Sequence, residues 1–528
     1  MSPPTNGKHY PVSGTVLNSV TSEPIRRALV RVTSGAEQYV AFTGADGRFQ
    51  LPGVLEGTAF LSGERPGYFD SRSLSTSPFS QANAGNQVTS GTNDFKVLLT
   101  PEAKVVGTAL DGDGEPIENL QVIVLARQIV QGRKQWLTKG SGTTNESGSF
   151  RIEGQIAGTA VVCTGSRPAE SLVSKITEVY PPRCFPNSPD LTSAQTIELA
   201  AGAEARADFR LQAIPGFSVS GVVQGGQGGY VSAWIDAPGS QPAAFGGTEM
   251  NPSTGKFVIR AVPNGTWNFH FHGNDGQGKG FEAYQQVTVG GTNVSGLQVV
   301  LQPEAEIPVE IRYITSNSPQ VTGQNTEQPG QNTEQPEQNI GSVQVQLVPA
   351  SEGDAGQYYS SPLPNANNQP GVSQAIALRG VPQGTYHVYA QSGGGGCIDS
   401  VSSGNADLSR EPLTIAAGSA PAAITVTMRR DCATLDVTTH SDIGGAPGLL
   451  LLTSDSAAVQ PQIVPIQSNG SASFQNLAPG SYRIYALSDL EGLEYANPQA
   501  MRGIESETVT LTPNQKSAVN LQLVRRSQ

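Results

Sequence analysis

The chain has 528 residues and a formal net charge of −12, and only 14% of its residues are charged. An acidic balance without a cluster of lysine and arginine argues against nucleic acid and against an anionic membrane surface as partners, because both require a basic face. No run of about 18 apolar residues occurs, so the sequence predicts no membrane-spanning segment. The 61 glycines and 37 prolines favour turns and short strands over helices.

A pattern of turn, short strand and second turn recurs five times along the chain. In the first copy, residues 43–58, Phe49, Leu51 and Val54 supply the apolar positions of a half-buried strand. Glycine marks both turns, because it adopts positive φ without a Cβ clash. The second-turn glycines of the five copies are Gly57, Gly158, Gly265, Gly384 and Gly480. They are 101, 107, 119 and 96 residues apart, which is the size of a whole small domain rather than of a solenoid unit.

The repeat predicts an all-β protein made of five tandem antiparallel β-sandwich domains of the Ig-like or transthyretin-like type. We expect a disordered tail at residues 1–8 and sandwiches at 9–101, 102–213, 214–303, 304–430 and 431–528, here called units one to five. Within unit four, residues 315–340 contain the heptapeptide GQNTEQP twice, and we expect a disordered loop there. The short, proline-bearing joints between units predict a semi-rigid rod.

Unit one carries a recognisable set of turn and core positions: Gly14, Pro24, Ala28, Val30, Val32, Thr43, Asp46, Gly47, Phe49, Leu51, Gly53, Val54, Gly57 and Gly67. Unit two repeats much of it at Gly107, Asp111, Gly114, Pro116, Leu120, Val122 and Val124. These units resemble the carboxypeptidase regulatory-like domain, a seven-stranded transthyretin-like sandwich also grouped under the carbohydrate-binding-like fold. Units three to five keep mainly the hairpin and the closing strand.

That resemblance implies the fold and an exported location, since chains of this kind are common among large bacterial envelope proteins. It does not imply peptidase chemistry, because in the carboxypeptidases the module accompanies a separate catalytic domain. The first residues lack the apolar core of a signal peptide, which taken alone favours the cytoplasm. The lysine-poor strands, rich in serine, threonine, glycine and asparagine, favour export. We therefore expect an extracellular or cell-envelope protein and leave open whether a leader lies upstream of Met1.

Four cysteines fall into two groups, Cys163 with Cys184 inside unit two and Cys397 with Cys432 around the joint of units four and five. In an exported protein they are candidates for two disulfides, one fixing an inserted loop and one joining the last two units. In a reducing compartment they would be free thiols, and the sequence alone leaves the connectivity open. Their spacing lacks the close pairs of a zinc site.

Residues 230–236 alternate aromatic or polar side chains with small apolar ones. If the apolar residues point inward, Tyr230, Trp234 and Asp236 form an outward row. Flat aromatic rings beside a hydrogen-bonding carboxylate suit sugar rings, whose C–H faces stack on indole. The alternative is that Trp234 packs beneath a neighbouring loop or unit.

His270 and His272 lie two residues apart and share one face of a predicted strand, and the aromatic residues between and before them share the core face. The two histidines are a possible metal pair or ligand contact. Because no third ligand is evident, we predict no metal and no cofactor. The glycine-rich run at 273–280 imitates a phosphate loop, but Gly280 stands where Ser or Thr would ligate magnesium, so we expect a solvated turn.

We find no nucleophile on a strained turn with a histidine near it, and therefore predict that the protein is not an enzyme. The expected function is a structural or adhesive scaffold that contacts polysaccharide or other envelope proteins. Two alternatives remain open at this stage: a dedicated carbohydrate-binding protein, and an accessory array for a separate envelope enzyme or transporter.

Overall fold

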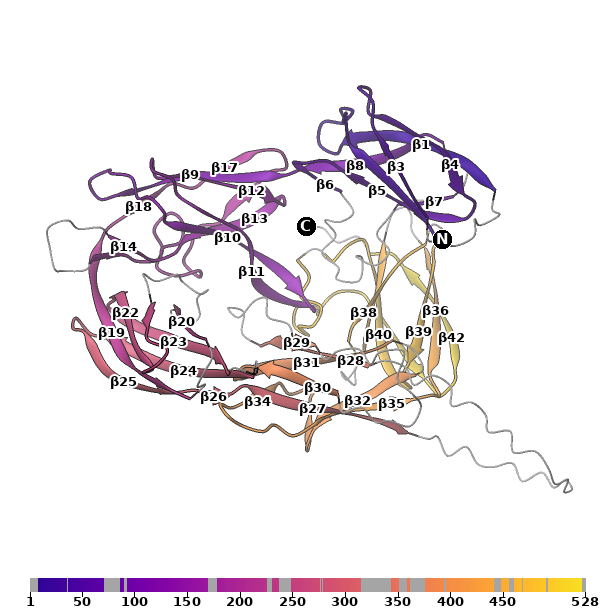
Figure 1. Ribbon diagram of the computed structural model, residues 1–528. Coiled ribbons are helices and arrows are strands. Elements are labelled where there is room, and N and C mark those ends of the chain that lie inside the picture. The colour runs from indigo at the N-terminus through magenta and orange to yellow at the C-terminus, as the bar shows by residue number, and fades with distance from the viewer. Residues whose placement is uncertain are drawn as a thin grey trace, which may run out of the picture.

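The computed structural model describes residues 8–35, 37–70, 86–89, 93–169, 178–225, 230–236, 248–275, 277, 279–314, 343–350, 359–360, 376–393, 396–440, 448–454, 460–467, 469–490 and 492–524. Across these residues the regular secondary structure consists of strands, so the predicted all-β fold class is confirmed (Figure 1). In this part of the chain no helix has the length and hydropathy needed to cross a bilayer. The predicted loop at 315–340 and nearly all of the predicted tail lie outside the described residues.

The strands of units one and two form pairs of facing sheets. In unit one, the sheet β4-β1-β8-β6 consists of β1 (His9–Asn18), β4 (Arg48–Leu55), β6 (Tyr68–Asp70) and β8 (Phe95–Pro101). Its partner β3-β2-β5-β7 consists of β2 (Leu29–Ser34), β3 (Glu37–Phe42), β5 (Thr58–Glu64) and β7 (Asn86–Thr89). In unit two, β9 (Ala103–Asp111) pairs with β12 (Ser149–Gln155), β17 (Glu204–Arg206) and β18 (Phe209–Leu211). The second sheet is β11-β10-β13-β16, made of β10 (Gln121–Val130), β11 (Arg133–Thr143), β13 (Gly158–Thr164) and β16 (Ile197–Leu199).

Units two and three share a sheet. The short strands β14 (Arg167–Ala169) and β15 (Glu178–Tyr180) come from unit two, and β15 pairs with the first residues of β19 (Ile214–Gln224). β19 also pairs with β22 (Lys256–Pro263) and β25 (Val294–Val300), and β21 (Thr248–Met250) extends the sheet. The facing sheet of unit three is β20-β23-β24-β26, made of β20 (Val231–Asp236), β23 (Gly265–Asn274), β24 (Gly280–Val289) and β26 (Gln302–Pro303).

Units four and five follow the same plan. Unit four contains the sheet β30-β27-β35-β32-β33, made of β27 (Ala305–Ile314), β30 (Ile376–Val381), β32 (Cys397–Ser403), β33 (Ala406–Asp407) and β35 (Ile424–Arg429). It faces β29-β28-β31-β34, made of β28 (Val343–Pro349), β29 (Tyr359–Ser360), β31 (Gly384–Ser392) and β34 (Leu413–Ile415). In unit five, β36 (Ala433–His440), β39 (Ser471–Leu477) and β42 (Lys516–Gln522) face β37 (Leu449–Ser454), β38 (Gln462–Pro465), β40 (Gly480–Leu487) and β41 (Glu507–Leu511).

Apolar side chains that alternate along the strands fill the space between each pair of sheets. The structure contains one such buried cluster within each unit. The largest fully buried side chains include Phe209 of unit two, Phe257 of unit three and Phe474 of unit five. In each unit the first strand departs from the expected antiparallel pattern. It pairs in parallel with strand residues near the end of the unit, as in β1 with β8, β9 with β17 and β18, β19 with β25, β27 with β35, and β36 with β42.

The array of units curves back on itself, so the predicted rod is wrong (Figure 1). The hairpin of β10 and β11 extends from unit two and contacts units four and five. Gln135 Nε2 donates a hydrogen bond to Pro349 O (3.2 Å), the backbone N–H of Ala496 donates to Gly132 O (3.0 Å), and Lys134 pairs with Glu494 (2.7 Å). The joints between units are short, but they do not keep the chain extended. The long hairpin of unit two instead contacts units four and five, which are far from it in sequence.

Two units have their outer sheet face covered by a loop of the same chain. In unit two, Leu125, Val161 and Cys163 point away from the main core and are buried by Cys184 and Leu191. In unit five, the outward residues Leu451 and Tyr485 are buried by Leu493 and Tyr495, and Ile129 of the β10–β11 hairpin packs against this cluster. The covering residues come from the connection after β13 in unit two and after β40 in unit five.

Candidate functional site

Among the described residues, no loop covers the outer sheet face of unit three, which carries an ordered grid of side chains. The strand register places Trp234 of β20 opposite His270 of β23, and His270 opposite Tyr284 of β24. The next row along the strands aligns Asp236 and Asn268 in the same way. Successive side chains of a strand point to opposite faces, so these residues share the outer face while their neighbours enter the core. The predicted inward position of Trp267, Phe269 and Phe271 is confirmed, since all three are buried.

The first row is a continuous aromatic surface, called here the aromatic row (Trp234, His270 and Tyr284). The imidazole of His270 stacks on the indole of Trp234, with ring centroids 5.2 Å apart and planes 2° apart. The ring of Tyr284 meets the same imidazole edge to face, again at 5.2 Å between centroids. Trp234 remains 38% exposed and Tyr284 44% exposed. The row therefore leaves parts of two aromatic side chains exposed to solvent on a sheet.

A hydrogen-bond network beside the aromatic row fixes its members. The carboxylate of Asp236 accepts from Asn268 Nδ2 (2.8 Å), and its other oxygen lies 2.7 Å from His270 Nε2. The hydroxyl of Tyr284 donates to Asn268 Oδ1 (2.7 Å). Asp236 is only 9% exposed, so its carboxylate orients the aromatic rings and is not itself a free outward group.

The other two candidate residues on this face lie outside the aromatic row. Tyr230 is 72% exposed and stands just before β20. His272 pairs with Glu304 (2.6 Å) at the joint with unit four. There the backbone N–H of Gln383 donates to Glu282 (2.5 Å), and burial raises the pKa of the Glu282 carboxyl. His270 and His272 thus have separate carboxylate partners, and within the described residues no group of three or more metal-ligating side chains is arranged to hold an ion.

The connection between β23 and β24 explains why this face is open. In units two and five the corresponding connection is a long loop that covers the outer face, whereas in unit three it is a tight turn at 275–279. The Asp275 carboxylate accepts hydrogen bonds from the N–H groups of Gln277 and Lys279, both at 2.9 Å, as expected of a solvated turn. The outer face of unit three carries aromatic and polar side chains in place of the aliphatic ones that a covering loop would bury.

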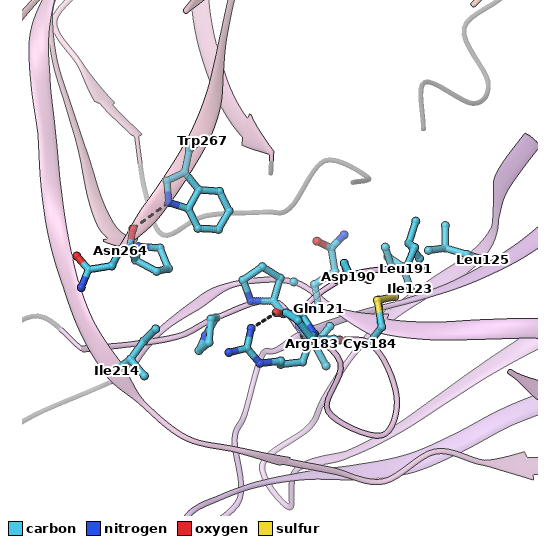
Figure 2. A pocket seen from close by; sticks show the side chains of 17 residues that line it. Gln121, Ile123, Leu125, Arg183, Cys184, Asp190, Leu191, Ile214, Asn264 and Trp267 are labelled. Atoms are coloured by element: carbon cyan, nitrogen blue, oxygen red, sulfur yellow. Dashed lines mark hydrogen bonds between the residues drawn. A yellow bond between two sulfur atoms is a disulfide. The ribbon is translucent and has the colours of Figure 1, made fainter. Parts of the chain in front are cut away.

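A pocket of about 230 Å³ lies where units two and three meet, and it is called here the junction pocket (Figure 2). Unit two contributes β10, β13 and the loop around Arg183, and unit three contributes Ile214 at the start of β19 and the turn leading to Trp267. The indole N–H of Trp267 donates to Pro263 O (2.8 Å), which holds the ring at the wall. Burial lowers the pKa of the Arg183 guanidinium.

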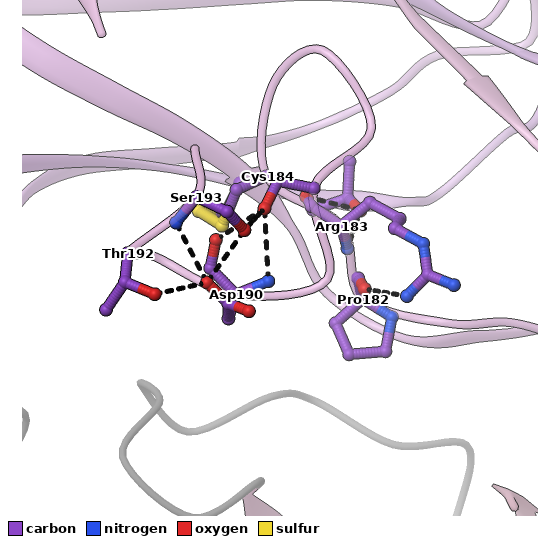
Figure 3. The surroundings of a disulfide bond; sticks show 9 residues. Pro182, Arg183, Cys184, Asp190, Thr192 and Ser193 are labelled. Carbon is purple, nitrogen blue, oxygen red and sulfur yellow. Dashed lines mark hydrogen bonds between the residues drawn. A yellow bond between two sulfur atoms is a disulfide. The ribbon is translucent and has the colours of Figure 1, made fainter. Parts of the chain in front are cut away.

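The disulfide between Cys163 and Cys184 attaches the loop of the junction pocket to β13 (Figure 3). Next to it, the carboxylate of Asp190 accepts hydrogen bonds from the hydroxyl of Thr192 (2.7 Å) and from the N–H and hydroxyl of Ser193 (2.9 and 2.8 Å). These hydrogen bonds lower the pKa of Asp190 and close the loop on itself.

A second disulfide joins Cys397 of β32 to Cys432, which follows β35 at the joint of units four and five. Beside it, the Arg429 guanidinium forms a two-bond pair with Asp431 (both 2.9 Å) and a further contact with Asp399 (3.2 Å). All four cysteines are evident from the sequence, but the junction pocket is not. Its walls come from two units, and only the inserted cysteine loop pointed toward it.

Comparisons with known proteins add the following. No protein-family model matches the chain, and no curated protein matches it. Among solved structures, the minor pilin GBS52 of Streptococcus agalactiae matches at 10% identity with a TM-score of 0.21, over 39% of this chain and 97% of that one. The Bacillus anthracis TIE protein matches at 10% identity and a TM-score of 0.16, over 81% and 75% of the two chains. A putative adhesin from Bacteroides ovatus matches at 14% identity and a TM-score of 0.14, over 38% and 93%. Scores this low establish neither a shared domain arrangement nor a family.

Proposed function

We propose that the protein is a non-catalytic binding scaffold of the bacterial cell envelope or the extracellular space, built from five sandwiches with the boundaries given above. Within it, the aromatic row of unit three binds polysaccharide. The observation that carries this proposal is the exposed stack of Trp234, His270 and Tyr284 on a sheet face that the chain covers in units two and five.

The geometry of the row fits the chemistry of a sugar chain. A pyranose ring presents C–H groups on its face and hydroxyls at its rim, so it stacks on an aromatic plane while its hydroxyls find polar partners beside it. Here the Trp234 and Tyr284 rings are partly exposed, and Asn268 and Gln286 lie in the adjacent row. Because Asp236 and Asn268 already hold the rings in place, little side-chain entropy is lost on binding.

The test is retention of the protein on polysaccharide affinity gels, with a panel of bacterial and plant polysaccharides immobilised one at a time. We expect Trp234→Ala to weaken retention about tenfold, since truncation of a central aromatic contact commonly costs more than 1 kcal/mol. The melting temperature should stay unchanged, because Trp234 lies outside the buried core.

Phe42→Ala is the matched control, because Phe42 is a 71% exposed aromatic residue on unit one. It should leave retention as in the wild type. Equal loss in both variants, or retention that does not depend on Trp234, would contradict the assignment of the aromatic row.

A further inference from the structure

Among the residues that the structure describes, the guanidinium of Arg183 in the junction pocket has no anionic partner. Arg183 Nη1 donates to Pro182 O (2.9 Å), and among the described residues no carboxylate forms an ion pair with this side chain. Figure 2 shows the guanidinium extending toward Ile214, with Trp267 and Asn264 across the pocket. An arginine presents five N–H donors in a planar fork, so one bond to a carbonyl leaves most of its hydrogen-bonding capacity unused.

The one acidic side chain in the pocket wall does not fill this role. Asp190 lies on the opposite side of the loop from the guanidinium, and its carboxylate is bonded to Thr192 and Ser193 (Figure 3). Burial lowers the pKa of the Arg183 guanidinium, as expected for a cation that is partly withdrawn from water. Partial burial of a cation without a counter-charge is unfavourable, and a bound anion would relieve it.

The remaining walls define the body of the ligand. They are mostly apolar and include Leu125, Leu191, Pro182, Ile214 and the indole of Trp267. A volume of about 230 Å³ is below the range of about 300–1,000 Å³ typical of drug-sized sites, so the pocket suits a molecule with a single ring. The disulfide between Cys163 and Cys184 fixes the unit-two wall of the pocket, and the shared β15–β19 ladder joins that wall to unit three. Both connections favour a pre-formed pocket.

We infer that the junction pocket binds a compact organic carboxylate with an apolar ring, its carboxylate on Arg183 and its ring between Trp267 and Ile214. An arginine fork accepts a carboxylate through two parallel charge-assisted hydrogen bonds, and the indole and aliphatic side chains exclude water from the ring. This site is separate from the aromatic row, and it does not depend on the polysaccharide proposal.

The first experiment compares ligands on the unmodified protein by isothermal titration calorimetry. Phenylacetate is the probe, and phenylacetamide is its neutral analogue of nearly the same shape. We expect phenylacetate to bind at least tenfold more tightly than the amide, because only the acid offers a negative charge and two acceptor oxygens to the Arg183 fork. Equal affinity of the two, or no binding of phenylacetate, would overturn the inference. Glucuronate tests the apolar part of it, since tighter binding of this sugar acid than of phenylacetate would also be inconsistent with the ring assignment.

The second experiment places the site. Arg183→Gln should weaken phenylacetate binding about 10- to 100-fold, the range expected for charge-assisted hydrogen bonds. Arg183→Lys should bind phenylacetate with an affinity between those of the wild type and Arg183→Gln, since lysine keeps the charge and lacks the planar fork. Arg206→Gln is the matched control in the same unit, because Arg206 is a solvent-exposed residue paired with Asp208 (2.6 Å). Trp234→Ala should leave phenylacetate binding unchanged. Unchanged binding in Arg183→Gln would refute the site, and loss of binding in Arg206→Gln would refute its location.

Discussion

A single substitution at Gly132 can test the docking of the β10–β11 hairpin onto unit five. Gln131 and Gly132 form its two-residue turn, both with positive φ (49° and 78°), as in the turns that match the twist of a hairpin. A Cβ added at Gly132 would lie 2.6 Å from ring carbons of Tyr495 and 2.7 Å from the Cβ of Ala496. Gly132→Ala therefore combines backbone strain of about 1–2 kcal/mol with overpacking of about 1–3 kcal/mol.

The polar contacts that hold the hairpin contribute a free energy similar to this cost. Three hydrogen bonds join the hairpin tip to units four and five. Gln135 donates one of them, and the carbonyl oxygens of Gln131 and Gly132 accept the other two. At about 0.5–1.5 kcal/mol each they contribute a few kcal/mol, and the partly exposed pair of Lys134 and Glu494 adds at most about 1 kcal/mol. The substitution thus offsets most of the free energy that these polar contacts supply, which leaves mainly the packing of Ile129 against unit five. We therefore expect the hairpin to leave unit five more often.

Two measurements read out this opening. Hydrogen exchange at the Ala496 amide, which donates to Gly132 O, should accelerate, and small-angle scattering should show a larger radius of gyration. Gly154→Ala is the control, because Gly154 also has positive φ (70°) and nothing lies within 4 Å of its added Cβ. If Gly132→Ala leaves both readouts at wild-type values, or Gly154→Ala opens the array equally, the hairpin does not hold the units together.

Three further predictions concern the thiols and the charged groups. Alkylation of the denatured protein without reductant should label no cysteine, and four labelled thiols would rule out both disulfides. Burial and the nearby Arg133 lower the pKa of His387 to about 4 in the folded protein. Because the unfolded chain takes up the proton near pH 6.5, the contribution of neutral His387 to the unfolding free energy is complete above pH 6.5 and is lost as the pH falls towards 4. The His387→Gln variant should lose that part of the pH dependence of thermal unfolding, and an unchanged profile would argue against it. Arg429→Gln leaves the buried Asp431 without its two-bond partner, and we expect a loss of about 2 kcal/mol in unfolding free energy. Thermal melts should show this loss, while the exposed Arg206→Gln should melt like the wild type.

The parts of the fold that depend on local sequence were predictable. Phe49, Leu51 and Val54 alternate with polar residues between two glycine turns, and all three are buried. The same reasoning assigned His270 and His272 to the outer face and their aromatic neighbours to the core. These assignments succeed because the period of two along a strand fixes which side chains share a face.

Features made by contacts between units were not predictable. Residues 121–143 show only strand patterning, and nothing in them indicates that their tip packs against Tyr495, more than 350 residues later. The junction pocket likewise requires Arg183 and Trp267 to meet across two units. The role of Asp236 also needed the structure, because its burial depends on the side chains of the neighbouring strand.

The parallel pairing of first and last strands has a mechanical consequence. When a chain is pulled from its two ends, a parallel pair of terminal strands is loaded along its length, so its hydrogen bonds resist together instead of opening one after another. The register of β36 with β42 extends from Thr434 with Lys516 to His440 with Gln522, and β27 and β35 form a similar ladder. We therefore expect the units to resist stretching strongly, and single-molecule pulling on the whole chain should show high rupture forces.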